Sequence, residues 1–392
     1  MYCSKLKIFF LIFSLFLSVL SCAPKNQTVQ NSDPNTLIIA VKSLPSKIKI
    51  ARLIERKLSR VNERFEMVPD ALQSEGFGPF EIIEETPKKI KLKNRHDPAL
   101  PVSLEFVVFE VIEDDNLRAL ALKNRQVDVV QNDMWEKLPE PLEESLKQDP
   151  HLKFQSTDGS QAVYLAFNLE DPWLSKIEIR KALAYALDPS SFVNYSSTVT
   201  PALTLLPPSH WAYEKDVTLY KKEDFKLAQE LLKQTLIQDN TSAQNIVDPT
   251  RKLTLTLKVA SRDMSMARWL AKSLSRLGIE LRLDAGHSKQ RSQMILMTTP
   301  EDPQVLSEPV FLSELYHQTA YDQLSASLSQ TSDLPARKEV YSWMQKILSQ
   351  DLPVIPLWYV KNRIIYRDTI DNVRLRPDGS YEWILDVSKR SE

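Results

Sequence analysis

The pattern of hydrophobic and polar positions is clearest in residues 164–189, which read YLAFNLEDPWLSKIEIRKALAYALDP. From Tyr164 to Asn168 successive residues alternate between two faces, which predicts a strand with two unlike surfaces. Asp171 and Pro172 end this strand, because the steric demands of a proline restrict the residue before it. The pattern therefore predicts a strand that leaves its sheet through a short loop.

A helix is predicted directly after this loop. Ser175 followed by Glu178 matches a capping box, in which two side chains satisfy backbone N–H groups at a helix start. The buried stripe of the helix recurs at helical spacing and consists of Ile179, Leu183, Ala186 and Leu187. Asp188 and Pro189 end this helix and suit the N-cap and first turn of another.

The first third of the chain predicts mostly strands. Residues 36–41 (TLIIAV) are rich in β-branched side chains and predict a buried strand. Residues 48–65 predict a helix that is basic on one side. After a glycine turn at residues 76–80, three alternating runs predict an antiparallel sheet with one solvated face, at residues 81–85, 88–95 and 102–113.

Further along the chain, residues 253–284 predict a right-handed β-α-β unit, with Gly278 as the C-cap glycine of its helix. Capped helices are predicted at residues 224–236 and 333–350, and a turn at residues 377–379. An acidic cluster, Asp114-Asp115-Asn116, precedes a helical stretch. Capping of that helix is the favoured interpretation and a metal site is the alternative.

The N-terminus has the features of a secretory signal. Lys5 and Lys7 give it a positive start, residues 8–20 form an apolar run, and Cys22 follows small residues. A cysteine at this place resembles the bacterial lipobox and would become the lipidated first residue of the mature chain. The alternative is a transmembrane anchor, but the run is shorter than the roughly 20 residues that span a bilayer.

Composition narrows the remaining functions. The 392 residues include 50 basic and 51 acidic side chains, so no basic face for nucleic acid is indicated. Glycine occurs only 6 times, which disfavours glycine-rich phosphate loops, and proline occurs 24 times. Cys3 and Cys22 are the only cysteines, so we expect no disulfide and no thiol chemistry in the mature chain. No hydrolase motif or metal-ligand spacing is found, so neither an enzyme, a cofactor nor a metal is predicted.

Two stretches carry a family resemblance. YLAFN with the following IRKALAYALDP, and LPVIPLWY at residues 352–359, resemble the peptide- and nickel-type bacterial extracellular solute-binding proteins (family 5) of ABC importers. The LGIEL turn at residues 277–281 is also typical of that family. The resemblance covers most of residues 76–392. Arg125 stands where the family has a turn glycine, and the left-handed position is expected to shift to Asn124.

The resemblance implies an α/β, two-lobed periplasmic-binding-protein-like fold (type II, peptide-binder class). One small subdomain of the family is missing, because residues 70–76 cross directly to the glycine turn. The implied organisation follows the chain: a lipoprotein signal peptide at 1–21, a flexible tether at 22–35, the first part of lobe 1 at 36–170, lobe 2 at 171–352 and the return to lobe 1 at 353–392.

Candidate ligand contacts lie near the predicted crossings between the lobes, where ligands of two-lobed proteins bind. Tyr164, Asn168, Trp173, Trp358 and Tyr359 share this location, and core packing is the alternative for each. In peptide-binding members an aspartate of a DYpDP motif holds the ligand's ammonium group. Here Thr299 occupies that place, with Glu301 or Asp302 as possible substitutes, and a plain turn is the alternative.

The implied function is capture of a dipeptide or oligopeptide between the lobes and delivery to an ABC permease, by a monomer held at the cell envelope by lipid. The alternatives are a degenerate member that serves as an envelope scaffold or sensor without transport, and a lipid-anchored hydrolase. An interface between the lobes filled by apolar side chains would favour the scaffold. Convergence of Ser, His and a carboxylate would favour the hydrolase.

Overall fold

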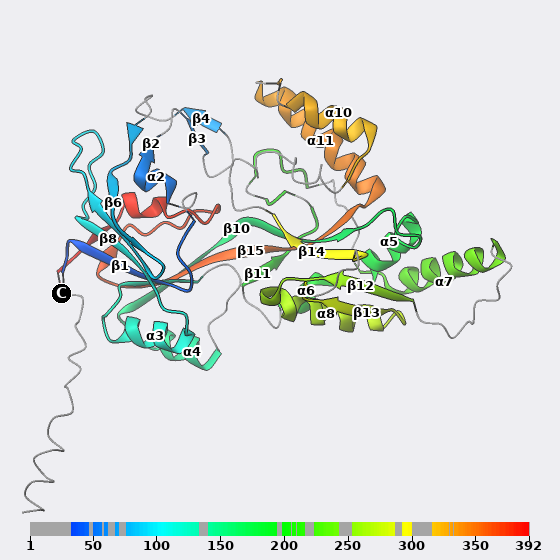
Figure 1. Cartoon of the computed structure of the whole chain (residues 1–392), viewed down its shortest axis with the longest axis horizontal. Coiled ribbons are helices and arrows are strands. Elements are labelled where there is room, and N and C mark those ends of the chain that lie inside the picture. The colour runs from blue at the N-terminus through cyan, green and yellow to red at the C-terminus, as the bar shows by residue number, and fades with distance from the viewer. Residues whose placement is uncertain are drawn as a thin grey trace, which may run out of the picture.

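The computed structural model shows an α/β protein in which one long mixed sheet runs through two lobes (Figure 1). The structure describes residues 33–46, 50–56, 59–61, 67–69, 76–132, 140–193, 198–204, 206–208, 210–215, 223–242, 253–286, 292–299, 316–328, 330–331 and 333–391. The predicted signal peptide, Cys22, Glu301 and Asp302 lie outside these residues. Within the described part, none of the helices combines the length and apolarity needed to cross a bilayer.

Two long strands, β10 Leu152–Phe167 and β15 Val354–Arg367, form the centre of the sheet and pair antiparallel along most of their length. The strand order is β13-β12-β14-β10-β15-β9-β1-β8-β7-β6, and β11 also pairs with β15. The other strands of this sheet are β1 Thr36–Val41, β6 Phe80–Thr86, β7 Lys89–Asn94, β8 Phe106–Val111, β9 Val129–Asn132, β11 Val199–Pro201, β12 Thr254–Lys258, β13 Glu280–Asp284 and β14 Met294–Thr298.

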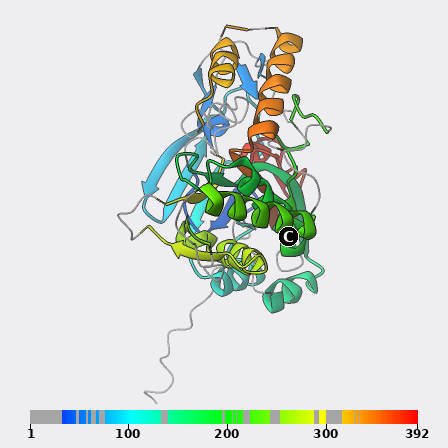
Figure 2. The same ribbon diagram turned by 90° about the vertical axis from the view of Figure 1, so that its right-hand side faces the viewer.

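The first lobe is built on β6, β7, β8, β1 and β9. β1 runs parallel to both β8 and β9, and the predicted antiparallel runs form β6, β7 and β8. One face of this half is covered by α3 Asp115–Lys123 and α4 Glu140–Lys147 (Figure 1; Figure 2). The other face packs against the C-terminal segment, whose Tyr381, Trp383 and Ile384 are buried with β1 and β8 residues in one cluster.

Short elements complete the first lobe. These are α2 Ala51–Ile54, the strand pairs β2 Glu55–Arg56 with β5 Gly76–Phe77, β3 Ser59–Val61 with β4 Met67–Pro69, and β16 Ile370–Asp371 with β17 Ser388–Lys389, and the 3-10 helix η3 Glu382–Leu385. The helix predicted over residues 48–65 is wrong for the described residues, because only α2 is helical. Glu55 is extended and pairs with Phe77, so tertiary pairing ends the helix after one turn.

The second lobe contains the predicted β-α-β unit. β12 and β13 are parallel, α8 Met264–Ser275 joins them, and Gly278 takes the positive φ that its C-cap role requires. The other helices are α5 Ile177–Tyr185, α6 Pro189–Val193, α7 Phe225–Ser242, α10 Thr319–Leu328 and α11 Leu334–Asp351. α10 and α11 stand on the face of the sheet opposite to α3 and α4 (Figure 1; Figure 2).

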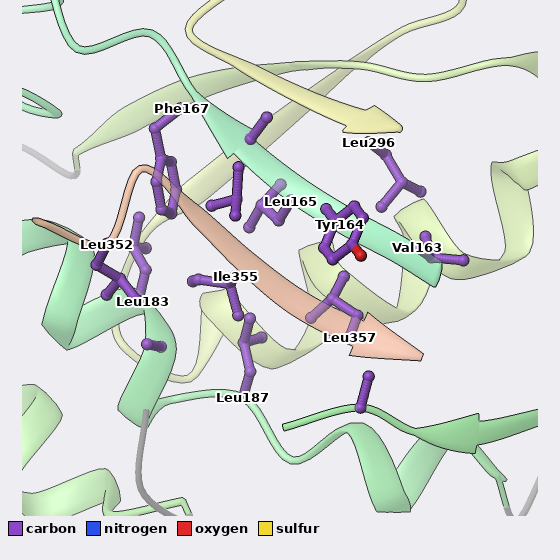
Figure 3. Packing of buried hydrophobic residues seen from close by; sticks show 14 of the residues in the cluster. Val163, Tyr164, Leu165, Phe167, Leu183, Leu187, Leu296, Leu352, Ile355 and Leu357 are labelled. Carbon is purple, nitrogen blue, oxygen red and sulfur yellow. The ribbon is translucent and has the colours of Figure 1, made fainter. Parts of the chain in front are cut away.

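The core of the second lobe lies against the central strand pair. Figure 3 shows Leu165 of β10 and Ile355 of β15 beside Leu183 and Leu187, two residues of the predicted helical stripe. All four side chains are fully buried. The amphipathic pattern of α5 therefore correctly predicted the helix face that packs on the crossing strands.

The helix ends confirm the predicted N-caps of α3 and α11 and correct two other predictions, the capping box of α5 and the turn after α3. Asp114 and Asp333 accept backbone hydrogen bonds as N-caps of α3 and α11. The predicted capping box at Ser175 is wrong: α5 has Lys176 at its N-cap without a side-chain cap, and the Ser175 hydroxyl donates to the Pro172 carbonyl oxygen. The left-handed residue after α3 is Arg125 itself, with φ 61°, and not Asn124, whose φ is −82°.

Arg180 of α5 connects the two ends of the second lobe. Its guanidinium donates to the carbonyl oxygens of Leu174 (2.6 Å) and Ser175 (2.9 Å), which follow the first crossing. It also donates to the carbonyl oxygens of Asp351 and Leu352, which precede the second crossing. Burial lowers the pKa of Arg180, although Asp351 opposes that shift.

Candidate functional site

The candidate residues predicted on the crossing strands come together around the β10–β15 pair. Tyr164 lies between Met297 of β14 and Pro356 of β15 and is almost fully buried. Burial, with smaller contributions from Tyr359 and Tyr321, raises the pKa of Tyr164 well above its ordinary value. This phenol therefore stays protonated over the physiological range.

Trp358 and Tyr359 are neighbours in β15 and are both held by hydrogen bonds. The Trp358 indole donates to the Pro189 carbonyl oxygen at 2.9 Å, and its ring packs against Phe192 and Trp269. The Tyr359 hydroxyl lies 2.7 Å from the carbonyl oxygens of both Thr204 and Leu206. The polar atoms of these two aromatic side chains thus contribute to the fold, and their contact with a ligand stays a prediction.

Thr299 continues the pairing of β14 with β10. Its N–H donates to the Ala162 carbonyl oxygen, and its hydroxyl accepts from the Ala162 N–H, each at 2.9 Å. The Gln161 side chain donates to the Thr299 carbonyl oxygen at 3.2 Å. The residue at the place of the family's anchoring aspartate is thus a buried, neutral group on the crossing, so nothing at this position supplies a negative charge for an ammonium group.

Asn168 and Trp173 lie in the loop after β10 and are only half buried. Asp171 shapes this loop by accepting hydrogen bonds from the N–H groups of Trp173 and Leu174 and from the Gln293 side chain. Lys176 lies 5.0 Å from the centre of the Trp173 ring. Trp173 is therefore a partly accessible aromatic surface fixed in place by its own loop.

The structure also reveals a row of polar side chains that the sequence pattern did not identify. Gln131 of β9 and Gln155 of β10 both pair with Ile364 of β15, so the two amides lie on the same face of the sheet. Among the described residues, none donates a hydrogen bond to the buried side-chain oxygens of Gln131, Gln155 and Gln161. Because an unpaired buried oxygen is costly, we expect water or a ligand to donate to these groups.

The described residues contain no cluster of three or more His, Cys, Asp and Glu side chains able to hold a metal ion. The candidate groups identified here are neutral amides and aromatic side chains. The signal that could have located Gln131 and Gln155 is their strand alternation, but only the pairing with Ile364 brings them together.

The long mixed sheet and its two crossing strands define the fold class as the two-lobed α/β fold of peptide- and nickel-binding proteins. Solved structures agree with this fold class. The crystal structure of NikZ from Campylobacter jejuni with Ni(L-His) matches with a TM-score of 0.70 at 17% identity, over 91% of this chain and 100% of that one. The peptide complex of DppA from Helicobacter pylori matches with a TM-score of 0.62 at 20% identity, over 81% of this chain and 63% of that one.

The profile of bacterial extracellular solute-binding proteins, family 5, matches residues 22–323, and the chain belongs to this family. Di/tripeptide-binding protein 1 of Pseudomonas aeruginosa is 24% identical over 78% of this chain and 59% of its own length. The probable ABC transporter periplasmic-binding protein SapA of Escherichia coli is 25% identical over 79% of this chain and 58% of its own length. The chain thus spans less than two thirds of the length of these relatives, which is consistent with the expected loss of a subdomain.

Proposed function

We propose that the chain is a lipid-anchored receptor of an ABC importer that captures peptide-like solutes between its lobes and delivers them to a permease. The observation that carries the proposal is the pair of continuous strands, β10 and β15, that joins two lobes in a member of this family. Di/tripeptide-binding protein 1, whose name specifies peptides, supports the ligand class. The name of SapA of Escherichia coli, an ABC transporter periplasmic-binding protein, supports the link to an importer. Lipid attachment through Cys22 would hold the protein at the periplasmic or extracytoplasmic face of a membrane.

The mechanism is closure of the lobes around the solute, which shifts the population toward a form that the permease binds. Gln161, in the bulge of β10 between the two lobes, supports this function, because a primary amide can pair with the backbone groups of a peptide whatever its side chains. Trp173 and Asn168 would contact the solute from the loop. The roles of Tyr164, Thr299, Asp302, Trp358 and Tyr359 remain predictions.

The alternative function is a degenerate receptor that acts as an envelope scaffold or sensor. The lipid-anchored hydrolase gains no support from the contacts described at the crossing, which are structural hydrogen bonds of strands, loops and aromatic side chains.

Thermal unfolding of the chain starting at Ala23, in the presence of di- to pentapeptides, tests the proposal. A ligand that binds only the folded protein at about a hundred times its Kd stabilises it by about 2.7 kcal/mol, so the midpoint should rise with peptide concentration. The same peptides with blocked termini are the matched control for recognition of charged ends. A well-folded sample whose midpoint no peptide moves would refute peptide capture and favour another solute or the scaffold.

Lipid attachment is tested separately in cells. The full chain should partition with membranes and incorporate a fatty-acid label, and Cys22→Ser should abolish both. Cys3→Ser is the control, because Cys3 belongs to the segment that the signal peptidase is expected to remove. Labelling that persists in Cys22→Ser would overturn the assignment of Cys22.

A further inference from the structure

The junction of the two lobes is marked by a change of strand partners. On β15, residues 363–366 pair with β9 of the first lobe, whereas residues 358–360 pair with β11 of the second lobe. On β10, residues 163–167 pair with β14 of the second lobe. Within the described sheet, only β10 and β15 continue through both lobes. Motion of one lobe against the other must therefore bend these two strands between the two sets of partners.

A bulge occupies the junction on β10. Asp158 pairs with Lys361 and Ala162 with Tyr359, so residues 159–161 lie opposite Val360. A bulge leaves extra residues out of the ladder and bends the strand locally. At Gly159 a Cβ atom would lie only 2.0 Å from the Val360 carbonyl oxygen, so this position admits no side chain without separating the strands. The two crossing strands are thus in tight contact where the bend must occur.

The C-terminal turn at residues 376–379 binds both strands at this bulge. The Pro377 carbonyl oxygen accepts from the Ser160 N–H of β10 at 2.8 Å and from the Asn362 side chain of β15 at 3.0 Å. The same Asn362 side chain donates to the Arg376 carbonyl oxygen at 2.9 Å. Ser160 and Asn362 are 2% and 4% exposed, so these bonds are shielded from water.

The turn itself is attached to the first lobe. Arg376 forms a half-buried ion pair with Glu382 at 3.0 Å, and the next residues, Tyr381 and Trp383, are buried in the core of that lobe. Gly379 closes the turn with a positive φ, and a Cβ atom there would lie 3.3 Å from the Asn362 side chain. The turn therefore links the core of the first lobe by direct contacts to both strands of the junction.

We propose that the turn at residues 376–379 is a brace that fixes the angle between the lobes, with Asn362 as its positioning residue. Without the brace the bulge keeps the β10–β15 ladder and the hydrogen bonds of Gln161 and Ala162 with Thr299, but it loses its link to the first lobe, and the lobes sample a wider range of angles. The inference goes beyond solute capture and rests on the proposed function only in assuming that the lobes close around a solute.

The test measures the distance between the lobes without any ligand. Cys3 and Cys22, the only cysteines, are replaced by serine, and spin labels are placed on cysteines introduced at the exposed positions Glu85 of β6 and Lys338 of α11. Double electron–electron resonance spectroscopy then gives the distribution of distances between the two spin labels. In Asn362→Leu we expect the population outside the main distance to rise roughly tenfold, because two buried hydrogen bonds to the brace are lost.

Asn94→Leu is the matched control. Asn94 is 6% exposed and donates to two carbonyl oxygens, those of Val102 and Leu104, within the first lobe. The Asn94→Leu variant should lower the unfolding midpoint at least as much as Asn362→Leu does, but it should leave the distribution of label distances unchanged. If Asn362→Leu does not fold, Gly379→Ala is measured instead, since its Cβ presses on Asn362 at a strained φ and should broaden the distribution.

An unchanged distribution in a folded Asn362→Leu or Gly379→Ala protein would overturn the brace, whatever happens to the midpoint. Broadening in Asn94→Leu equal to that in Asn362→Leu would overturn it too, because the effect would then be general destabilisation. Neither result depends on a peptide, so failure of the brace and failure of peptide capture are distinguished by separate experiments.

Discussion

Arg180→Met should destabilise the second lobe, because the guanidinium joins the segments by which the chain enters and leaves that lobe. Arg180 is 5% exposed and contacts carbonyl oxygens of four residues, Leu174, Ser175, Asp351 and Leu352. Methionine keeps an apolar side chain of similar length but supplies no donor. The substitution therefore removes hydrogen bonds while leaving most of the packing in place.

The magnitude follows from the acceptors left behind. A buried acceptor that loses its partner costs about 1–3 kcal/mol. Four such oxygens set an upper bound near 12 kcal/mol, but some will reach water, and the cost of burying the Arg180 charge disappears with the side chain. We expect a net loss of about 3–5 kcal/mol in the free energy of unfolding, which is about 1 kcal/mol for each acceptor left unpaired.

Urea unfolding followed by circular dichroism measures this loss. Arg282→Met is the control, because Arg282 is well exposed and its ion pair with Glu280 at 3.1 Å should contribute less than about 1 kcal/mol. The loss of unfolding free energy in Arg180→Lys should fall between those of Arg180→Met and Arg282→Met, since lysine keeps the charge without the planar fork of donors. A loss below about 1 kcal/mol for Arg180→Met would refute the reasoning, because it would mean that water replaces the guanidinium at little cost.

Two further changes probe other parts of the fold. Gly159→Ala should destabilise the protein by more than about 2 kcal/mol, measured by urea unfolding, because its Cβ would lie 2.0 Å from the Val360 oxygen. Gly278→Ala, where only the positive φ is penalised, should cost about 1 kcal/mol, and equal losses would contradict the close approach. Burial raises the pKa of Glu143, but hydrogen bonds and charges of Arg363 and Lys147 outweigh it and lower the pKa below its ordinary 4.5. Glu143 therefore stabilises the fold above pH 4.5 and loses that contribution as pH falls through its folded pKa. Glu143→Gln should accordingly flatten the acid limb of a stability–pH curve, and an acid limb as steep as that of the unchanged protein would contradict this account.

Local signals predicted much of the fold correctly. The β-α-β unit at residues 253–284 and the N-caps Asp114 and Asp333 depend on residues close in sequence, so the pattern contains the necessary information. The capping box at Ser175 failed because Asp171 already binds the N–H groups of Trp173 and Leu174 and shifts the helix start. Competition between two nearby caps is decided by the loop path, which the pattern does not show.

Non-local pairing explains what the sequence could not predict. The first half of β10, from Leu152 to Gln161, has a polar sequence and becomes a strand because β15 pairs with it. The row of Gln131 and Gln155 likewise exists only because both residues pair with Ile364. Among the predicted contacts, Tyr164, Trp358 and Tyr359 lie on the crossing strands, and Thr299 directly follows β14. The hydrogen bonds of Trp358, Tyr359 and Thr299 to the fold could not be foreseen, and the contact of all four residues with a ligand stays a prediction.

The position of the last residues of the chain has a consequence for folding. Tyr381, Trp383, Ile384 and Val387 complete the first-lobe core together with β1 near the other end of the chain, and the Lys389 ammonium lies 2.9 Å from the buried Asp128 carboxylate. This core cannot form until residues 381–387 dock against β1. Contacts between segments so far apart in the sequence slow folding, so the first lobe is expected to stay incomplete until these residues have joined it.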